Sequence, residues 1–133
     1  MAISELPILS MLRTKMQWHQ ERQRLLAENV ANADMPRFKP RDLAAPSFAR
    51  NGTAVPASPT LIVTDTGHQA GSIANTTQFK IEHRGGFEVR PSGNAVNLED
   101  EMLKVAANQM DYQTATSLYS RSLDLIKIAL GKK

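Results

Sequence analysis

Cysteine, aromatic residues and long apolar runs are absent or scarce in this sequence. There is no cysteine, which excludes disulfide bonds and cysteine-ligated metal. Aromatic residues make up 5% of the chain, and because large side chains supply much of the burial in a compact core, we do not expect a thick globular core. No run approaches the roughly 18 apolar residues that cross a bilayer, so direct membrane insertion is not expected.

The first residues, MAISELPILSMLRTK, also lack the features of a cleaved secretory signal. Such a signal has a basic region followed by a long apolar region, and neither is found here. We therefore expect a protein that either remains in the cytoplasm or leaves it by a route that does not cleave a signal.

The net charge of +3 comes entirely from the middle of the chain. Residues 1–34 carry four basic and four acidic side chains, residues 97–133 carry five of each, and residues 35–96 carry seven basic and four acidic side chains. Proteins that bind nucleic acid usually concentrate basic residues on one face or stripe. This distribution argues against nucleic acid as a partner.

The first of three expected segments, residues 1–34, has a helical pattern from about Ser4 to Ala33. Its stripe recurs every 3.5 residues on average, which is the period of a helix lying along another helix. Pro7 is compatible with a helix start, where its missing N–H costs nothing. His19 and Gln23 are polar members of the stripe. Its apolar members expected to pack are Leu9, Leu12, Met16, Leu26 and Val30.

The last segment, residues 97–133, predicts one helix of about 34 residues, roughly 50 Å long. Asn97 is a good N-cap, the run Glu99 to Glu101 places negative charge at the helix start, and Gly131 is a plausible stop. The apolar and aromatic stripe members expected to pack against the first helix are Val105, Tyr112, Tyr119, Leu123 and Ile126. A second apolar line, Leu118, Leu125 and Ile128 with Ala115, lies on another face and indicates more than one neighbour.

The middle segment, residues 35–96, contains six of the seven prolines and six of the seven glycines. We expect it to be mostly irregular, with short strand candidates at 60–64, 78–83 and 86–90. The fold class is therefore mainly α, with two long helices that pair as an elongated antiparallel coiled coil and at most a small β element between them. A long irregular connection of this kind suggests a segment that becomes ordered on a partner.

No catalytic, cofactor-binding or metal site is expected. His19, His68 and His83 do not have the spacing of metal ligands, and His19 is interpreted as a packed histidine on a helical stripe. The run TDTGHQAG at 64–71 contains Asp-Thr-Gly but lacks the apolar strand framework and second aspartate of a protease.

The two ends of the chain together resemble a known family. The stretch LLAENVANADMPRFKPRDL (25–43) is similar to the signature of bacterial flagellar axial proteins, in which a helix ends in Asn-x-x-Asn-Ala before Thr-Pro-Gly-Tyr. With residues 90–130, it resembles the flagellar basal body rod protein FlgB family, the proximal rod proteins. The matching motif residues are Asn29, Asn32, Ala33, Asp34, Pro36 and the aromatic Phe38.

Two residues depart from the family pattern. Met35 stands where the family has Thr, and Arg37 stands where it has Gly. A glycine permits positive φ, whereas Arg37 makes that conformation costly, so we expect the turn after Pro36 to differ in detail. Asn29 and Asn32 are expected to bond to carbonyls left unpaired at the helix end or to the backbone of a neighbouring subunit.

The resemblance implies a structural subunit of the flagellar proximal rod, a drive shaft that crosses the periplasm. It implies export without a cleaved signal through the flagellar type III apparatus, followed by helical polymerisation that transmits torque. The implied partners are other copies of the chain, other flagellar rod proteins, the rod-to-ring adaptor, the MS ring and the flagellar type III export gate. The basic loop, Arg37, Lys39 and Arg41, is expected to contact acidic residues of an adjacent subunit rather than phosphate.

Two alternatives remain open from the residues alone. A cytoplasmic coiled-coil adaptor or secretion chaperone would share the helical stripes and use the basic loop for an acidic partner, but it predicts a stable dimer in isolation. A nucleic-acid-binding protein predicts steep salt dependence of binding, against which the balanced charge of both helices argues.

Overall fold

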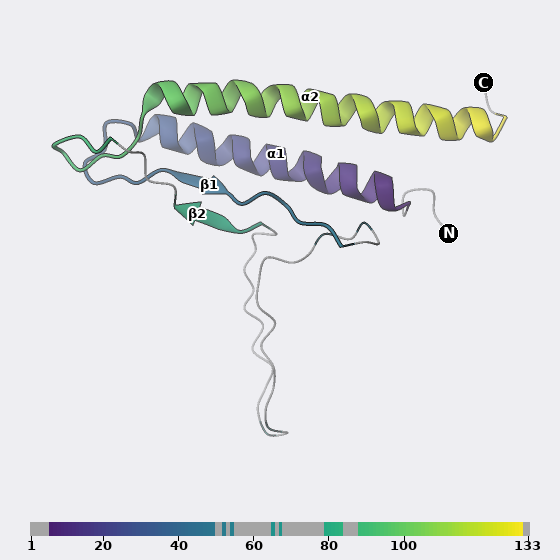
Figure 1. Cartoon of the computed structure of the whole chain (residues 1–133), viewed down its shortest axis with the longest axis horizontal. Coiled ribbons are helices and arrows are strands. Elements are labelled where there is room, and N and C mark those ends of the chain that lie inside the picture. The colour runs from purple at the N-terminus through teal and green to yellow at the C-terminus, as the bar shows by residue number, and fades with distance from the viewer. Residues whose placement is uncertain are drawn as a thin grey trace.

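The computed structural model describes residues 6–49, 52, 54, 65, 67, 79–83 and 88–131. Its described elements are α1 (Pro7–Ala31), β1 (Arg41–Leu43), β2 (Ile81–His83) and α2 (Leu98–Ala129). The two helices lie side by side and run in opposite directions, with the strands on the side of α1 away from α2 (Figure 1). The prediction of a mainly α fold with two long antiparallel helices is confirmed. Neither helix is long and apolar enough to cross a membrane.

Helix α1 is 25 residues long, shorter at its C-terminal end than the pattern predicted. Pro7 stands at its first position, where a missing backbone N–H removes no helical bond. At the other end the Asn32 side chain donates a hydrogen bond to the carbonyl of Glu28 at 2.8 Å. This bond satisfies one of the carbonyls that lose their partners where a helix stops.

Helix α2 is 32 residues long and has the two caps that the sequence predicted. The Asn97 side chain accepts hydrogen bonds from the backbone N–H groups of Glu99 and Asp100, at 3.1 and 3.4 Å. Gly131 follows the helix with a φ of 70°, a left-handed conformation that costs a glycine little. In Figure 1, α2 extends beyond the N-terminal end of α1.

The small sheet pairs β1 with β2 in antiparallel register, with Arg41 opposite His83 and Leu43 opposite Ile81. It packs on α1 through a cluster of Trp18, Leu25 and Leu43, with Phe79 and Ile81 partly buried against it. The Trp18 indole N–H also donates to the carbonyl of Ala44 at 2.8 Å. Residues 43 and 44 are therefore tied to α1, the first by apolar packing and the second by a hydrogen bond.

The strand predictions for the middle segment were only partly right. Strand β2 occupies the last three residues of the candidate at 78–83. Residues 88–90, the described part of the candidate at 86–90, form no strand, and the candidate at 60–64 lies outside the described residues. The pairing strand β1 was not predicted, because its residues Arg41, Asp42 and Leu43 show no alternation of apolar and polar side chains.

The turn after α1 is fastened to the turn before α2 by Asn94, which is 1% exposed. Its side-chain amide donates to the carbonyls of Asn32 and Met35, at 3.0 and 2.7 Å. The backbone adds two bonds, from Arg37 N–H to the Ser92 carbonyl at 3.1 Å and from Ala95 N–H to the Phe38 carbonyl at 3.0 Å. We call these two joined turns, residues 32–38 and 90–96, the end clasp.

Arg37 adopts the left-handed conformation that its side chain makes costly, with a φ of 61°. This residue therefore takes the positive φ that a glycine would permit, despite the cost to a side chain with a Cβ. Gly93, with a φ of 79°, lies against it, and a Cβ at Gly93 would stand 3.2 Å from Arg37 Cγ. The bonds of the end clasp hold Arg37 in place, so its strain is set by the surrounding structure.

Candidate functional site

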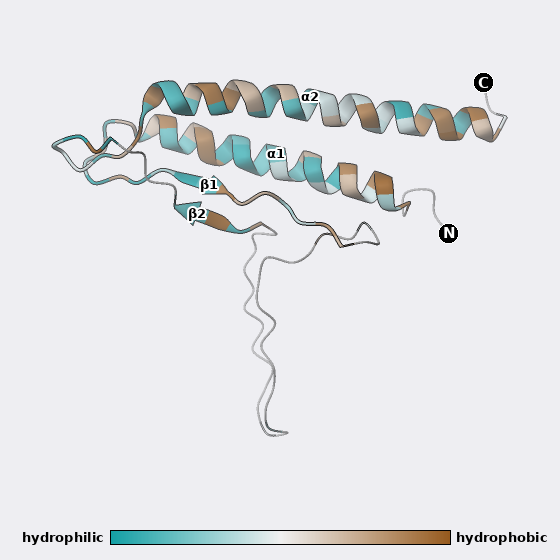
Figure 2. Ribbon diagram, viewed as in Figure 1, coloured by the Kyte–Doolittle hydropathy of each residue, from teal (hydrophilic) through white to brown (hydrophobic). Residues whose placement is uncertain are grey.

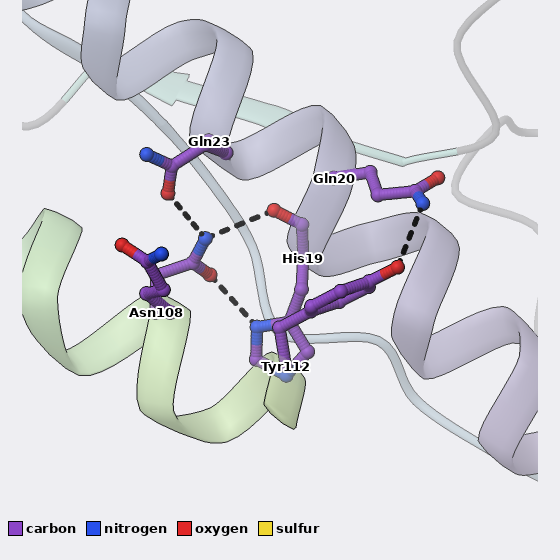
Figure 3. Close-up of a pocket in the computed structure, with 6 residues that line it drawn as sticks. His19, Gln20, Gln23, Asn108 and Tyr112 are labelled. Carbon is purple, nitrogen blue, oxygen red and sulfur yellow. Dashed lines mark hydrogen bonds between the residues drawn. The ribbon is translucent and has the colours of Figure 1, made fainter. Parts of the chain in front are cut away.

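Polar side chains occupy much of the seam between α1 and α2 (Figure 3). Asn108 of α2 reaches His19 of α1 through two hydrogen bonds, one from its amide nitrogen to the His19 carbonyl at 2.9 Å and one between its oxygen and His19 Nδ1 at 2.7 Å. The same amide nitrogen also donates to Gln23 Oε1 at 3.0 Å. One turn further along α2, the Tyr112 hydroxyl accepts from the Gln20 amide at 3.1 Å.

This network fixes the protonated nitrogen of His19. The His19 carbonyl can only accept, so the Asn108 amide nitrogen faces it and the Asn108 oxygen faces Nδ1, which must carry the proton. Nε2 is buried and has no hydrogen-bond partner among the described residues. His19 is thus a packed histidine that joins two helices.

A shallow groove of about 370 Å³ lies over this part of the seam and is lined by His19, Gln20, Gln23, Asn108, Gln109 and Tyr112. Apart from the imidazole, these side chains carry no ionisable group that is charged near neutral pH. The part of the chain that the structure describes holds no group of three or more metal-ligating side chains. The groove offers hydrogen-bonding groups, mainly side-chain amides and the Tyr112 hydroxyl.

Asn29 joins three parts of the chain. Its amide nitrogen donates to the Arg41 carbonyl at 2.7 Å and to Glu101 Oε2 at 2.8 Å, and its oxygen accepts from the Arg41 backbone N–H at 3.0 Å. It thus pairs with both backbone groups of a β1 residue, as a neighbouring strand would. The carboxylate of Glu101, which is 2% exposed, also accepts from Lys104 at 2.7 Å. Asn29 therefore binds strand β1 and helix α2, not the carbonyls at the end of α1.

A second polar link joins α1 to β1. The Arg22 guanidinium donates two hydrogen bonds to the Asp42 carboxylate, at 2.8 and 2.9 Å, and stacks over the Trp18 ring at 5.2 Å. Burial is the largest influence on Asp42 and opposes its ionisation. The bonds from Arg22 and the Leu43 N–H, with the positive charges of Arg22 and Lys104, together outweigh it. The pKa of Asp42 consequently lies below its usual value. The same pair raises the pKa of Arg22.

The side chains predicted to pack are all at least partly removed from solvent. Leu9 and Leu26 are fully buried. The others are half-buried: Leu12, Met16, Val30, Val105, Tyr112, Tyr119, Leu123 and Ile126. Met16 and Thr116 meet across the seam, where the Thr116 hydroxyl donates to the Met16 sulfur at 3.6 Å.

The predicted second face of α2 is exposed in the single chain. Leu118, Leu125 and Ile128 expose 49%, 68% and 71% of their surface, whereas Ala115, which was grouped with them, is buried. Leu103 and Met110, 69% and 68% exposed, extend the line toward the start of the helix. Steps of seven, eight, seven and three residues keep the five exposed side chains on one side of a helix of 3.6 residues per turn. We call these five residues the outer face of α2.

The motif residues and the basic loop lie around the end clasp. Ala33 is buried, Phe38 is half-buried, and Asp34, Pro36, Arg37 and Lys39 are exposed. Arg41 does not belong to a loop: it lies in β1 and forms an ion pair with Glu28 of the same chain. Of the three basic residues expected to reach another subunit, Arg41 thus already has an acidic partner in its own chain.

The sequence reasoning missed several residues of this arrangement. Trp18 and Leu25 lie off the predicted stripe because they face the small sheet rather than α2. Asn94 and Asn108 are 1% exposed, and a buried asparagine gives no periodic signal of its own. The sequence did give one indication of polar contacts between the helices. His19 and Gln23 are polar residues at regular positions of the apolar stripe, and such residues require polar partners on α2.

Comparison with known proteins identifies relatives that cover most of the chain. No protein-family model matches it. The flagellar basal body rod protein FlgB of Escherichia coli (strain K12) is 30% identical over 107 residues, 75% of this chain and 75% of that protein. FlgB of Yersinia enterocolitica is 30% identical over 98 residues, 71% of this chain and 72% of that protein, and FlgB of Cereibacter sphaeroides is 28% identical over 109 residues, 82% of each. This chain belongs to the family of flagellar basal body rod proteins named FlgB.

Proposed function

We propose that this chain is a structural subunit of the proximal rod, which polymerises with its long helices side by side. The subunit is exported through the flagellar type III apparatus without a cleaved signal and assembles in the periplasm. There it packs against other copies of itself and other rod proteins, and against the rod-to-ring adaptor, the MS ring and the export gate at the base. Many such contacts together transmit torque.

The observation that carries this proposal is the outer face of α2. Hydrophobic residues recur along α2 up to its C-terminal end (Figure 2). Leu103, Met110, Leu118, Leu125 and Ile128 lie exposed in a line that α1 does not cover. An extended apolar surface of this kind is typical of a protein–protein contact.

Helix α1 has no comparable outer face. Its one large apolar side chain that is exposed is Ile8, near its start. Most of its other exposed side chains are polar, namely Arg13, Lys15, Gln17, Gln20 and Arg24. A subunit with one apolar side and one polar side has a preferred direction of contact. This asymmetry favours packing through α2 and leaves α1 to hold the small sheet.

The proposal is tested by a charge in the middle of the apolar line. Leu125→Asp places a carboxylate on the outer face of α2 without touching α1, so the subunit folds but fails to assemble. The matched control is Ser120→Asp, because Ser120 is an exposed residue of the same helix outside the line. We expect the first variant to be produced at normal levels, to be absent from purified basal bodies and to abolish swimming, whereas the control swims.

Normal swimming by the Leu125→Asp strain would contradict the proposed packing. The cytoplasmic adaptor or secretion chaperone is not favoured, since the relatives are rod proteins and Arg41 of the basic loop is already paired with Glu28.

A further inference from the structure

Arg37 holds a backbone conformation that its own side chain makes unfavourable. Its φ of 61° is the one positive value outside glycine in the described part of the chain. Left-handed backbone is unfavourable for a residue with a Cβ, and such strain persists only where surrounding contacts impose it. Here the end clasp imposes it, through the bond from Arg37 N–H to Ser92 and the two bonds that Asn94 donates.

Within the described residues, no ion pair or side-chain hydrogen bond of Arg37 offsets this strain. The guanidinium is exposed and has no ion pair or hydrogen bond within the described residues, and the same is true of the Lys39 ammonium. By contrast, Arg41 pairs with Glu28 and Arg22 pairs with Asp42. A rigid turn therefore presents two unpaired positive charges at one end of the molecule.

Two unpaired carboxylates lie at the same end. Glu99 and Asp100, in the first turn of α2, are exposed, and their side chains form no ion pair in the part of the chain described. Their neighbour Glu101 differs, since it is buried and bonded to Asn29 and Lys104. The end clasp, which holds Arg37, leads directly into this turn through residues 90–96.

We propose that Arg37 and Lys39 of one copy bind Glu99 and Asp100 of a second copy that lies alongside it. When two copies lie side by side and point in the same direction, their equivalent ends are next to each other. Arg37 in the end clasp of one copy and Lys39 just after it then meet the acidic first turn of α2 in the next copy. The charges are complementary, and neither set has an ion-pair partner among the described residues of its own chain. This inference rests on the proposed function, because it requires side-by-side packing of copies.

The proposal predicts opposite effects of one substitution on stability and on association. Arg37→Gly removes the side chain and with it the strain of the positive φ, which glycine adopts at little cost. We therefore expect the melting temperature of the isolated subunit to rise by about 2–4 °C. We also expect self-association, measured by sedimentation at low salt, to weaken roughly three- to fivefold, with little difference from wild type at 0.5 M salt. Unchanged association at low salt, or a wild-type chain that does not self-associate, would overturn the inference.

Cross-linking tests the contact directly, because the natural sequence has no cysteine. A Lys39→Cys chain is mixed with a Glu99→Cys chain and treated with a short bis-maleimide, so that a cross-linked heterodimer reports two different copies. Arg37 and Asp100 stay in place to hold the contact. The control mixture pairs Lys39→Cys with Ser120→Cys. We expect heterodimer only in the first mixture, and equal yields would refute the contact.

A charge exchange separates this contact from general effects of charge. Arg37→Glu should lose association, and Arg37→Glu combined with Asp100→Arg should regain at least half of it. Failure of the double variant to recover would count against the pairing. The same cysteine pair, examined in purified basal bodies, separates the two proposals: absence of the chain there refutes the proposed function, whereas presence without the cross-link refutes this inference alone.

Discussion

The Arg22 guanidinium and the Asp42 carboxylate form a two-point contact between α1 and β1, with hydrogen bonds of 2.8 and 2.9 Å. The Asp42 side chain exposes 3% of its surface to solvent, and the Arg22 side chain exposes 19%. An ion pair this far from solvent makes each partner necessary, because removal of one leaves the other without compensation.

This pair predicts a defined pH dependence. The pKa of Asp42 is lowered on folding, so its stabilising effect is fully present above the unfolded value, about pH 4, and is lost as the pH falls through the lower folded value. Asp42→Asn should cost about 3 kcal/mol of unfolding free energy at pH 7, and the difference from wild type should shrink below about pH 4. Urea unfolding at several pH values measures both, and a difference that grows in acid would contradict the assignment.

The buried and exposed leucines should differ in their effect on stability. Leu26 is fully buried and Leu125 is 68% exposed. We expect Leu26→Ala to lower the unfolding free energy by about 3 kcal/mol, because it leaves a cavity, and Leu125→Ala to change it by no more than about 0.5 kcal/mol. Thermal unfolding of the two variants, compared at equal subunit concentration, tests the distinction. Equal losses would mean that the outer face of α2 is covered in the isolated protein.

Asn29 and Asn32 should not be equivalent, although both belong to one motif. Asn29→Ala leaves Glu101 and two backbone groups of Arg41 short of a partner and should cost about 2–4 kcal/mol. Asn32→Ala removes one bond to a helix-terminal carbonyl and should cost about 1 kcal/mol. Denaturant titration ranks the two, and the reverse order would refute the central place of Asn29.

Gly93 and Gly131 allow a matched test of the end clasp. Both have positive φ, but a Cβ at Gly93 would press on Arg37, whereas a Cβ at Gly131 meets nothing within 4 Å. Gly131→Ala should therefore cost about 1–2 kcal/mol for its backbone alone, and Gly93→Ala should cost more. Calorimetric melting curves measure the difference. Equal losses of unfolding free energy would show that the close approach of Gly93 to Arg37 does not contribute to stability.

The two helices were predictable because long periodic segments carry a strong signal, and both caps of α2 follow from local side-chain chemistry. Strand β1 was not predictable, since three residues with two charged side chains carry no period, and its pairing with β2 depends on a partner 40 residues away. The role of Glu101 was hidden for a related reason. Its place in an acidic run indicates a helix start, whereas its burial depends on Asn29, 72 residues earlier.

The polar seam also has a mechanical consequence. A slip of α2 along α1 by one helical turn, about 5.4 Å, would separate Asn108 from His19 and Glu101 from Asn29 at the same time. Apolar side chains tolerate such sliding better, because one apolar contact can replace another. Amides and carboxylates form hydrogen bonds only at defined distances and angles. The helix pair therefore resists shear along its length, and a load applied to one helix passes to the other without a change of alignment.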